Sequence, residues 1–299
     1  MLEPVKSLFN FLLHLSWFEF ARRLYNKFHA TDVLGRSANV AFYFSFAFFP
    51  FLFFLLSLFG IVLESTDDLR SELFRYLSRV MPPSAYELVR NTVEEIIKTS
   101  SGGKLTIGLL VTLWSASAGA GGVRKAMNAV YELKETRPWW QNRIQSVVLT
   151  LMFILLIAFG LIVVTVGWNA VEAAVAASGL GLASGWLLDV IEWSVVILLM
   201  ILTTSVIYSW VPNFKKFHWY WISPGAIVAI VLWIVFTSGF RSYLQYFNTY
   251  NRTYGSLGAV IILMLWMYLT GMAIILGGAI NSVLNEMYAE LSEKAADVI

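Results

Sequence analysis

Residues 254–281 of the chain read YGSLGAVIILMLWMYLTGMAIILGGAIN, and this stretch decides the fold class. No charged side chain stands between Arg252 and Glu286. A helix rises about 1.5 Å per residue and the hydrocarbon core of a bilayer is about 30 Å thick, so about 20 apolar residues span it. Because backbone polar groups in lipid must pair within their own segment, the stretch predicts a transmembrane helix.

The composition extends this prediction to the rest of the chain. Of the 299 residues, 58% are hydrophobic and only 13% are charged, whereas soluble domains carry roughly 25% charged residues. We therefore expect most of the surface to face lipid. The net charge of +2 gives no electrostatic sign of nucleic-acid binding. The chain has no cysteine, which excludes disulfides and thiolate metal sites, and we expect neither a metal nor a cofactor.

Charge-free stretches divide the chain into six predicted spans. They run over 37–63, 105–123, 144–171, 193–214, 217–240 and 253–285. Together they predict an all-α integral membrane protein with a six-helix transmembrane domain over 37–285. Lys and Arg cluster before span one, between spans two and three, and between spans four and five, so the positive-inside rule predicts these segments in the cytoplasm. Six spans then place both termini in the cytoplasm.

Three of the segments outside the predicted spans carry predictions of their own. Within residues 1–36, the stretch 4–30 predicts an amphipathic helix at the cytoplasmic membrane interface, or one packed on the protein's own cytoplasmic side. Residues 64–104 predict a two-helix cap on the outer face, which either gates a cavity or only packs over the bundle. Residues 286–299 are expected to form a cytoplasmic tail.

The second predicted span ends in a run of small residues, WSASAGAGG over 114–122. Small residues let helix backbones approach closely, and the glycines Gly119, Gly121 and Gly122 also weaken the helix. We expect either a broken helix beside a substrate site, as in transporters, or a tight helix crossing.

The last span has a glycine face of its own. Gly271 and Gly278 lie seven residues apart and therefore on roughly one side of a helix, which predicts close packing against a neighbour. Asn281, near the inner end of this span, is expected to cap a neighbouring backbone rather than to bind a substrate.

Seven cationic or amide side chains are the candidate substrate-binding residues. An arginine would attract an anionic headgroup, and an asparagine would donate hydrogen bonds to it. The candidates are Arg36, Asn39, Arg124, Asn128, Arg241, Asn251 and Arg252. The alternative for Arg36 and Arg124 is that they only anchor the chain at the cytoplasmic side of the membrane.

Several short blocks, taken in order, resemble one family. They are FY at 42–43 with FP at 49–50, WSAS at 114–117 with AMNAVY at 126–131, VPN at 211–213 after Tyr208 with PGA at 224–226, Phe240 with Tyr243, and YGSLG at 254–258 with LWMYL at 265–269. Over about residues 36–285 the chain resembles the YihY/BrkB family of bacterial inner-membrane proteins, once mislabelled as a ribonuclease. The resemblance implies a multi-pass protein of the bacterial cytoplasmic (inner) membrane, with a role in export or lipid-related transport.

One position departs from the family pattern. Ala279 stands where the family commonly has a glutamate near the end of the last span. Buried carboxylates in membranes often mark proton or cation sites, so this alanine weakens any expectation of proton coupling there.

Two functions remain open. The first is a transporter or flippase-like protein for a lipid or another amphipathic or anionic envelope substrate. The second is a non-catalytic scaffold in envelope assembly. A cavity that reaches Gly119 and Gly122 favours the first, and a solidly packed bundle favours the second. Expected partners are membrane lipids, with a homo-oligomer left open and no nucleic acid.

Catalysis is not expected. A metal-dependent nuclease needs clustered carboxylates or histidines to hold its ions. The three histidines, His14, His29 and His218, lie in separate segments, and the predicted spans contain no acid. We therefore expect no enzyme.

Overall fold

A computed structural model describes residues 15–62, 71, 74–79, 81–99, 105–178, 185–215, 222–246 and 256–296, and over these residues it is all-helical, without a strand. The helices are α2 (Trp17–Ala30), α3 (Val33–Val62), α5 (Pro83–Thr99), α6 (Leu105–Val130), α7 (Trp139–Ser178), α8 (Gly185–Trp210), α9 (Pro224–Tyr246) and α11 (Ser256–Ala296). Residues 1–14, the first part of the predicted N-terminal segment, lie outside the described residues. The all-α prediction is confirmed for the described residues.

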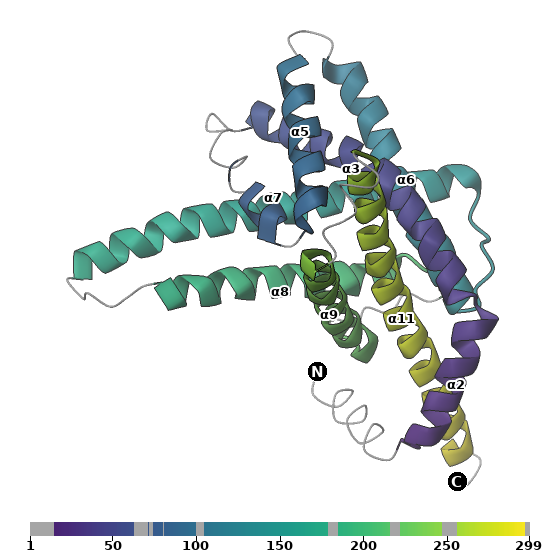
Figure 1. Ribbon diagram of the computed structural model, residues 1–299. Helices are drawn as coiled ribbons and strands as arrows, with labels where there is room; N and C mark the ends of the chain where they lie inside the picture. The colour runs from purple at the N-terminus through teal and green to yellow at the C-terminus, as the bar shows by residue number, and fades with distance from the viewer. Residues whose placement is uncertain are drawn as a thin grey trace.

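Helix α11, which carries the stretch quoted first, is the centre of the fold. It contacts α2, α3, α5, α6 and α9. In Figure 1, α5 lies at the top of the bundle, and α2 lies at the bottom beside the C-terminal part of α11. Helices α7 and α8 contact each other and extend together away from the bundle.

Five helices are long and apolar enough to cross a membrane in the part of the chain that the structure describes. The stretches are Val33–Leu55, Trp139–Gly160, Trp193–Trp210, Pro224–Tyr246 and Leu257–Leu291. They overlap five of the six predicted spans and confirm a multi-pass membrane protein. Helix α6 covers the second predicted span but is not among the five. The count of six spans and the sidedness therefore stay predictions.

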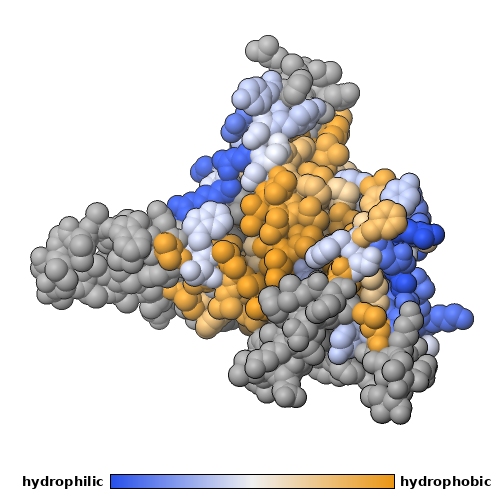
Figure 2. Space-filling view, turned by 90° about the horizontal axis from the view of Figure 1, so that it is seen from below, coloured by the Kyte–Doolittle hydropathy of each residue, from blue (hydrophilic) through white to orange (hydrophobic). Residues whose placement is uncertain are grey.

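The outward surface of these helices is hydrophobic. Phe46 of α3, Phe159 of α7 and Val235 of α9 are 67%, 63% and 57% exposed. Hydrophobic residues gather over the middle of the face drawn in Figure 2. A soluble monomer rarely exposes so large an apolar surface, so this one fits contact with lipid.

Of the two alternatives for the glycines of α6, the structure shows the tight helix crossing and not the helix break. The helix runs unbroken through Gly119, Gly121 and Gly122. A Cβ at Gly119 would lie 3.2 Å from Cδ1 of Phe44, and one at Gly122 would lie 3.0 Å from Cδ2 of Tyr43. The absence of side chains lets α3 lie against α6, and this packing stabilises the helix where glycine weakens it.

The glycines of α11 also meet neighbouring helices. A Cβ at Gly271 would lie 3.1 Å from Cγ1 of Val40 on α3, and one at Gly278 would lie 2.9 Å from Sδ of Met127 on α6. Ala279, at the family's acid position, is fully buried beside them.

Helices α9 and α11 approach most closely at the start of α9. A Cβ at Gly225 would collide with the carbonyl oxygen of Gly277. Asn281 Oδ1 accepts a hydrogen bond from the Gly225 amide at 2.8 Å, and Asn281 Nδ2 donates one to Ser223 Oγ at 2.8 Å. Asn281 therefore satisfies a free amide at the N-terminus of α9, and the predicted capping role is confirmed.

Helix α2 packs on the protein rather than standing apart from it. Its Phe20 and Leu24 cover Val283 and Leu284 of α11, while Phe18 on another face is 80% exposed. The described part of the N-terminal segment thus packs on the protein itself, as the second of the two interpretations expected. Its location at a membrane interface stays a prediction.

Candidate functional site

A cavity of about 340 Å³, partly open to the surroundings, lies between α3, α6, α7, α8, α9 and α11. We call it the central cavity. Its wall is mainly aromatic and aliphatic, with Phe44, Phe153, Ile207, Trp233 and Trp266 among the large side chains. Ligand pockets in proteins typically measure 300–1,000 Å³, so the space is large enough for a part of a small molecule or of a lipid.

The α6 wall of the central cavity is made by the small-residue run. Ala116, Gly119 and Ala120 line it. One of the two interpretations of the sequence placed these glycines in a broken helix beside a substrate site. The structure instead shows an intact helix whose short side chains leave room beside Phe44 and Phe153.

The polar groups in the cavity wall are already hydrogen-bonded. The indole nitrogen of Trp233 donates to Oγ1 of Thr270 at 3.1 Å, and that hydroxyl donates to the carbonyl of Trp266 at 3.0 Å. The hydroxyl of Thr150 donates to the carbonyl of Ser146 at 2.9 Å. A wall built in this way presents mostly hydrocarbon, and apolar cavities of this kind exclude water and accept apolar guests.

A polar cluster lies at one end of the cavity, around Glu135. We call it the Glu135 cluster, and its members are Arg124, Asn128, Glu135, Arg137, Gln145 and Asn213. The guanidinium of Arg137 donates to both carboxylate oxygens of Glu135, at 2.8 and 3.0 Å. Asn128 Nδ2 donates to the same carboxylate at 2.9 Å, and Arg124 Nε lies 3.7 Å from it. Arg124 and Arg137 therefore both pair with the carboxylate of Glu135.

The Glu135 cluster ties three parts of the chain together. Asn128 Oδ1 accepts from the Asn213 amide at 2.8 Å, just beyond the end of α8. Gln145 accepts from Arg137 at 2.8 Å and donates to the carbonyl of Trp210 at 2.8 Å. The cluster thereby fixes the 131–138 connection to α7 and to the C-terminal end of α8.

The pKa values in the Glu135 cluster follow from burial and pairing. Partial burial by itself raises the pKa of Glu135, but hydrogen bonds from Arg137 and Asn128 outweigh it and hold this pKa below its usual range. Burial lowers the pKa of Arg124, which the charge of Glu135 offsets in part. Glu135 is therefore ionised at neutral pH.

Arg124 connects the cluster with the cavity. Its guanidinium donates to the carbonyl of Asn142 and to Oγ of Ser146, both at 2.7 Å. Val123, the preceding residue, lines the central cavity, as does Thr150, one helical turn after Ser146. The apolar space and the ionised groups are therefore neighbours, an arrangement that suits an amphipathic ligand.

A second group of ion pairs joins α2 to α11. Lys27 is 6% exposed and its ammonium group bonds Glu132 and Glu286. Burial lowers the pKa of Lys27, but these two hydrogen bonds outweigh it, so the pKa lies above its usual value. Arg23 pairs with Glu290 at 2.6 Å. These contacts hold the N-terminal helix in place.

The remaining predicted substrate residues do not join the Glu135 cluster. Arg36 donates to the carbonyl of Thr31 at 2.6 Å, just after α2. Asn39 is exposed on α3. Arg241 donates to the carbonyl of Arg79 at 2.6 Å, just before the start of α5. Of the five candidates that the structure describes, Arg124 and Asn128 are thus brought into the cluster and the other three are not.

Two further candidates, Asn251 and Arg252, lie outside the described residues.

Sequence reasoning missed Glu135, Arg137 and Gln145 as members of one cluster. A signal was present in the mixed charges of the 131–138 connection, where Glu132 and Glu135 stand beside Lys134 and Arg137. Within the described ranges, no three His, Asp or Glu side chains are grouped as a metal ion would require.

Comparisons with known proteins identify relatives. Residues 24–298 match the family model described as virulence factor BrkB. The chain is 34% identical over 270 residues to the "putative ribonuclease-like protein YfkH" of Bacillus subtilis strain 168, a match that covers 89% of this chain and 95% of that protein. No solved structure matches the chain.

Proposed function

We propose that this chain, which belongs to the virulence factor BrkB family, is a flippase-like transporter of a lipid or another amphipathic, anionic envelope substrate. The observation that carries the proposal is the central cavity, an apolar space of about 340 Å³ bounded by six helices. A hydrocarbon chain fits such a wall because it gains by leaving water and needs no hydrogen bonds.

The polar end of the substrate would lie at the Glu135 cluster. The cavity wall ends at Val123 and Thr150, next to Arg124 and Ser146. An anionic headgroup there would compete with Glu135 for Arg124 and Arg137. Since Arg137 and its partner Gln145 hold the end of α8, this competition would loosen the end of the cavity. Binding of the substrate would then be coupled to opening of the cavity, because the headgroup would replace Glu135 as the partner of the two arginines.

The scaffold alternative is weaker because the bundle is not solid at its centre. A solid bundle would have left the glycines of α6 explained by packing alone. Here Gly119 both touches α3 and lines the central cavity. Specific partner capture by a transport-inactive protein would bring the scaffold back.

We do not propose nuclease activity, although a relative carries "ribonuclease-like" in its name. Cleavage of a phosphodiester needs grouped metal ligands or a nucleophile beside a base. The ionised groups that the structure brings together are paired acids and bases around Glu135 and Lys27, which fits structural and gating roles.

The test is lipid movement in proteoliposomes with fluorescent phosphatidylglycerol. Thr203 lines the central cavity, so Thr203→Phe fills the space and is expected to reduce transport at least tenfold. Val111→Phe adds a phenyl ring on the outer side of α6, where Val111 is 60% exposed, and is expected to transport normally. No transport by the wild-type protein across a panel of lipids, or equal transport by both variants, contradicts the proposal.

A further inference from the structure

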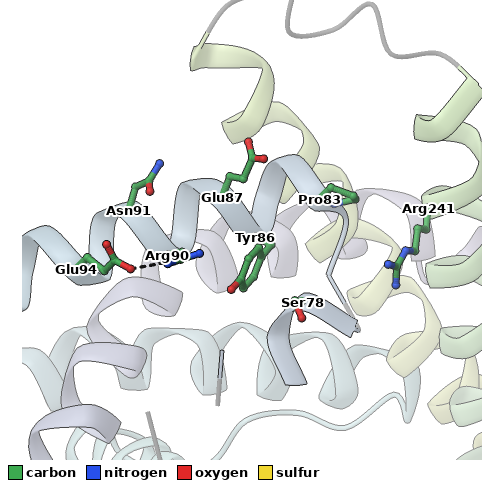
Figure 3. A pocket seen from close by; sticks show the side chains of 8 residues that line it. All are labelled: Ser78, Pro83, Tyr86, Glu87, Arg90, Asn91, Glu94 and Arg241. Carbon is green, nitrogen blue, oxygen red and sulfur yellow. Dashed lines mark hydrogen bonds and ion pairs between the residues drawn. The ribbon is translucent and has the colours of Figure 1, made fainter. Parts of the chain in front are cut away.

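A second pocket, of about 450 Å³, lies at the cap end of the bundle and differs from the central cavity in being lined by charged side chains. Figure 3 shows it between α5, the helical residues 74–79 and the end of α9. We call it the cap pocket. Its polar lining includes Tyr86, Glu87, Arg90, Asn91, Glu94 and Arg241.

Helix periodicity explains why one helix supplies most of these groups. Glu87, Arg90, Asn91 and Glu94 stand at positions i, i+3, i+4 and i+7 of α5, so they share one face. Arg90 Nε donates to Oε1 of Glu94 at 2.9 Å. Arg241 comes from α9 and closes the other side (Figure 3).

None of the residues that line the cap pocket lines the central cavity or belongs to the Glu135 cluster. The inference below therefore does not rest on the proposed transport function.

The charges in the cap pocket argue against an ionic ligand. Glu87 and Glu94 would repel an anion, and Arg90 and Arg241 would repel a cation. Arg90 and Glu94 already neutralise each other, and Arg241 already donates to the carbonyl of Arg79. Glu87 is exposed to water, which screens its charge. A zwitterion therefore finds no strong, desolvated charge of either sign.

The pocket is instead rich in hydrogen-bonding groups of both kinds. A carboxylate only accepts, a guanidinium only donates, and the Asn91 amide and the Tyr86 hydroxyl do both. A ligand that satisfies such a mixture must itself donate and accept at closely spaced positions, as the hydroxyls of a sugar do. The Tyr86 ring, held by an edge contact with Phe74 at 6.5 Å between centroids, adds an apolar face of the kind that sugar rings cover.

We propose that the cap pocket binds an uncharged polyhydroxyl group, either a free sugar or the sugar headgroup of a glycolipid. Glu87 accepts and Arg241 donates hydrogen bonds to the hydroxyls, and the Tyr86 ring contacts the C–H face. The pocket is thus a recognition site for a neutral carbohydrate, separate from the hydrocarbon site in the centre of the bundle.

The experiment uses the full chain in nanodiscs and two probes. Methyl β-glucoside in solution is followed by saturation-transfer NMR, and glucosyl diacylglycerol in the disc is followed by photocrosslinking to α5. Saturable binding of the free glucoside indicates a soluble sugar as the source, and crosslinking of only the glycolipid indicates a headgroup. Either result supports the proposal. If neither probe binds, the proposal is overturned.

Variants locate the binding. Glu87→Gln and Arg241→Met are each expected to weaken binding about tenfold, since hydrogen bonds to charged groups are the strong ones. Both side chains reach the surface, and Glu87→Gln keeps the shape, so the fold is retained. Arg22→Met removes an exposed cation from α2, at the other end of the molecule, and is expected to bind like the wild type.

Two further measurements separate this proposal from its rivals. Phosphoethanolamine, a zwitterion, should not displace the sugar probe, and displacement would overturn the assignment to a neutral polyol. The Thr203→Phe variant should still bind the probe. Binding with transport absent would refute the transport proposal alone, and transport with no probe binding would refute the carbohydrate site alone.

Discussion

Helices α9 and α11 pack against each other, and two of the contacts between them are built from opposite kinds of residue. At the first, Gly225 and Gly277 bring the backbones together until no Cβ fits between them. At the second, Trp233 and Trp266 stand side by side, with 6.4 Å between ring centroids, and form part of the cavity wall. Small residues close the bundle at one level, and large rings line an open space at the other.

The comparison teaches how a membrane bundle can be tight and hollow at once. Lipid supplies no hydrophobic force between helices, so association depends on close packing and hydrogen bonds. The glycine crossing and the Asn281 cap supply both at the start of α9. The cavity one to two turns further along is stable because its neighbouring crossing is strong.

The largest expected effect comes from closing the glycine crossing. Gly225→Ala places a Cβ against the carbonyl oxygen of Gly277, which is backbone and cannot rotate away. We expect a loss of more than about 4 kcal/mol, or no folded protein at all. Thermal unfolding in detergent measures the change. Gly239→Ala is the matched control on the same helix, because nothing lies within 4 Å of its Cβ position, and it should be neutral or slightly stabilising.

A smaller effect is expected from losing Asn281, which caps the N-terminus of α9 at the same crossing. Asn281→Leu removes two interhelical hydrogen bonds and leaves the Gly225 amide without its acceptor. Loss of a helix cap and of such bonds costs about 1–2 kcal/mol. Ser223→Ala keeps the bond from the Gly225 amide but loses the bonds from Asn281 Nδ2 and from the Ala226 amide, so its cost should be similar. Equal unfolding temperatures for Asn281→Leu and the wild type would show that the cap does not stabilise the crossing.

The Glu135 cluster predicts a dependence on pH. The folded-state pKa of Glu135 lies below its usual 4.5, so its contribution to stability is present above that value and is lost as the pH falls through the folded pKa. Glu135→Gln removes the contribution at every pH. The difference in unfolding temperature between wild type and variant should be greatest near neutral pH and shrink in acid. A difference that grows in acid would contradict the assigned ion pairs.

The smallest effect is expected in the cavity wall itself. Thr270→Val removes the acceptor of the Trp233 indole at almost constant volume. An interhelical hydrogen bond within the membrane contributes about 0.6 kcal/mol on average, so stability should fall by about this amount. The unpaired indole N–H should also make the wall more polar and weaken the binding of an acyl chain. Unchanged binding would show that the wall tolerates polar groups.

Most of the fold was predictable because its signals are local in sequence. Long charge-free runs mark five of the helices, and Asn281 near the end of the last span was expected to cap a neighbouring backbone, although its partner was not identified. The sequence left a helix break and a tight crossing open at Gly119–Gly122, because propensity describes an isolated helix and does not reveal that Tyr43 and Phe44 of α3 pack against this one.

The site was harder to predict because its parts are brought together by packing. Glu135 meets Arg124 and Asn128 across a turn after α6, and Asn213 joins from 85 residues away. Arg36 and Arg241 are cationic like Arg124, but they bond to the carbonyls of Thr31 and Arg79 and not to the cluster. Charge type alone could not separate the arginine that borders the cavity from those that do not.

The central claim is that the cavity holds a hydrocarbon chain, and photocrosslinking tests it most directly. The protein in nanodiscs is irradiated with phosphatidylglycerol that carries a diazirine in the middle of one acyl chain, and the labelled residues are mapped by mass spectrometry. The account predicts labelling of inward residues such as Phe153 and Ile207, abolished by Thr203→Phe. Labelling confined to outward residues such as Phe159 and Val235 would contradict it.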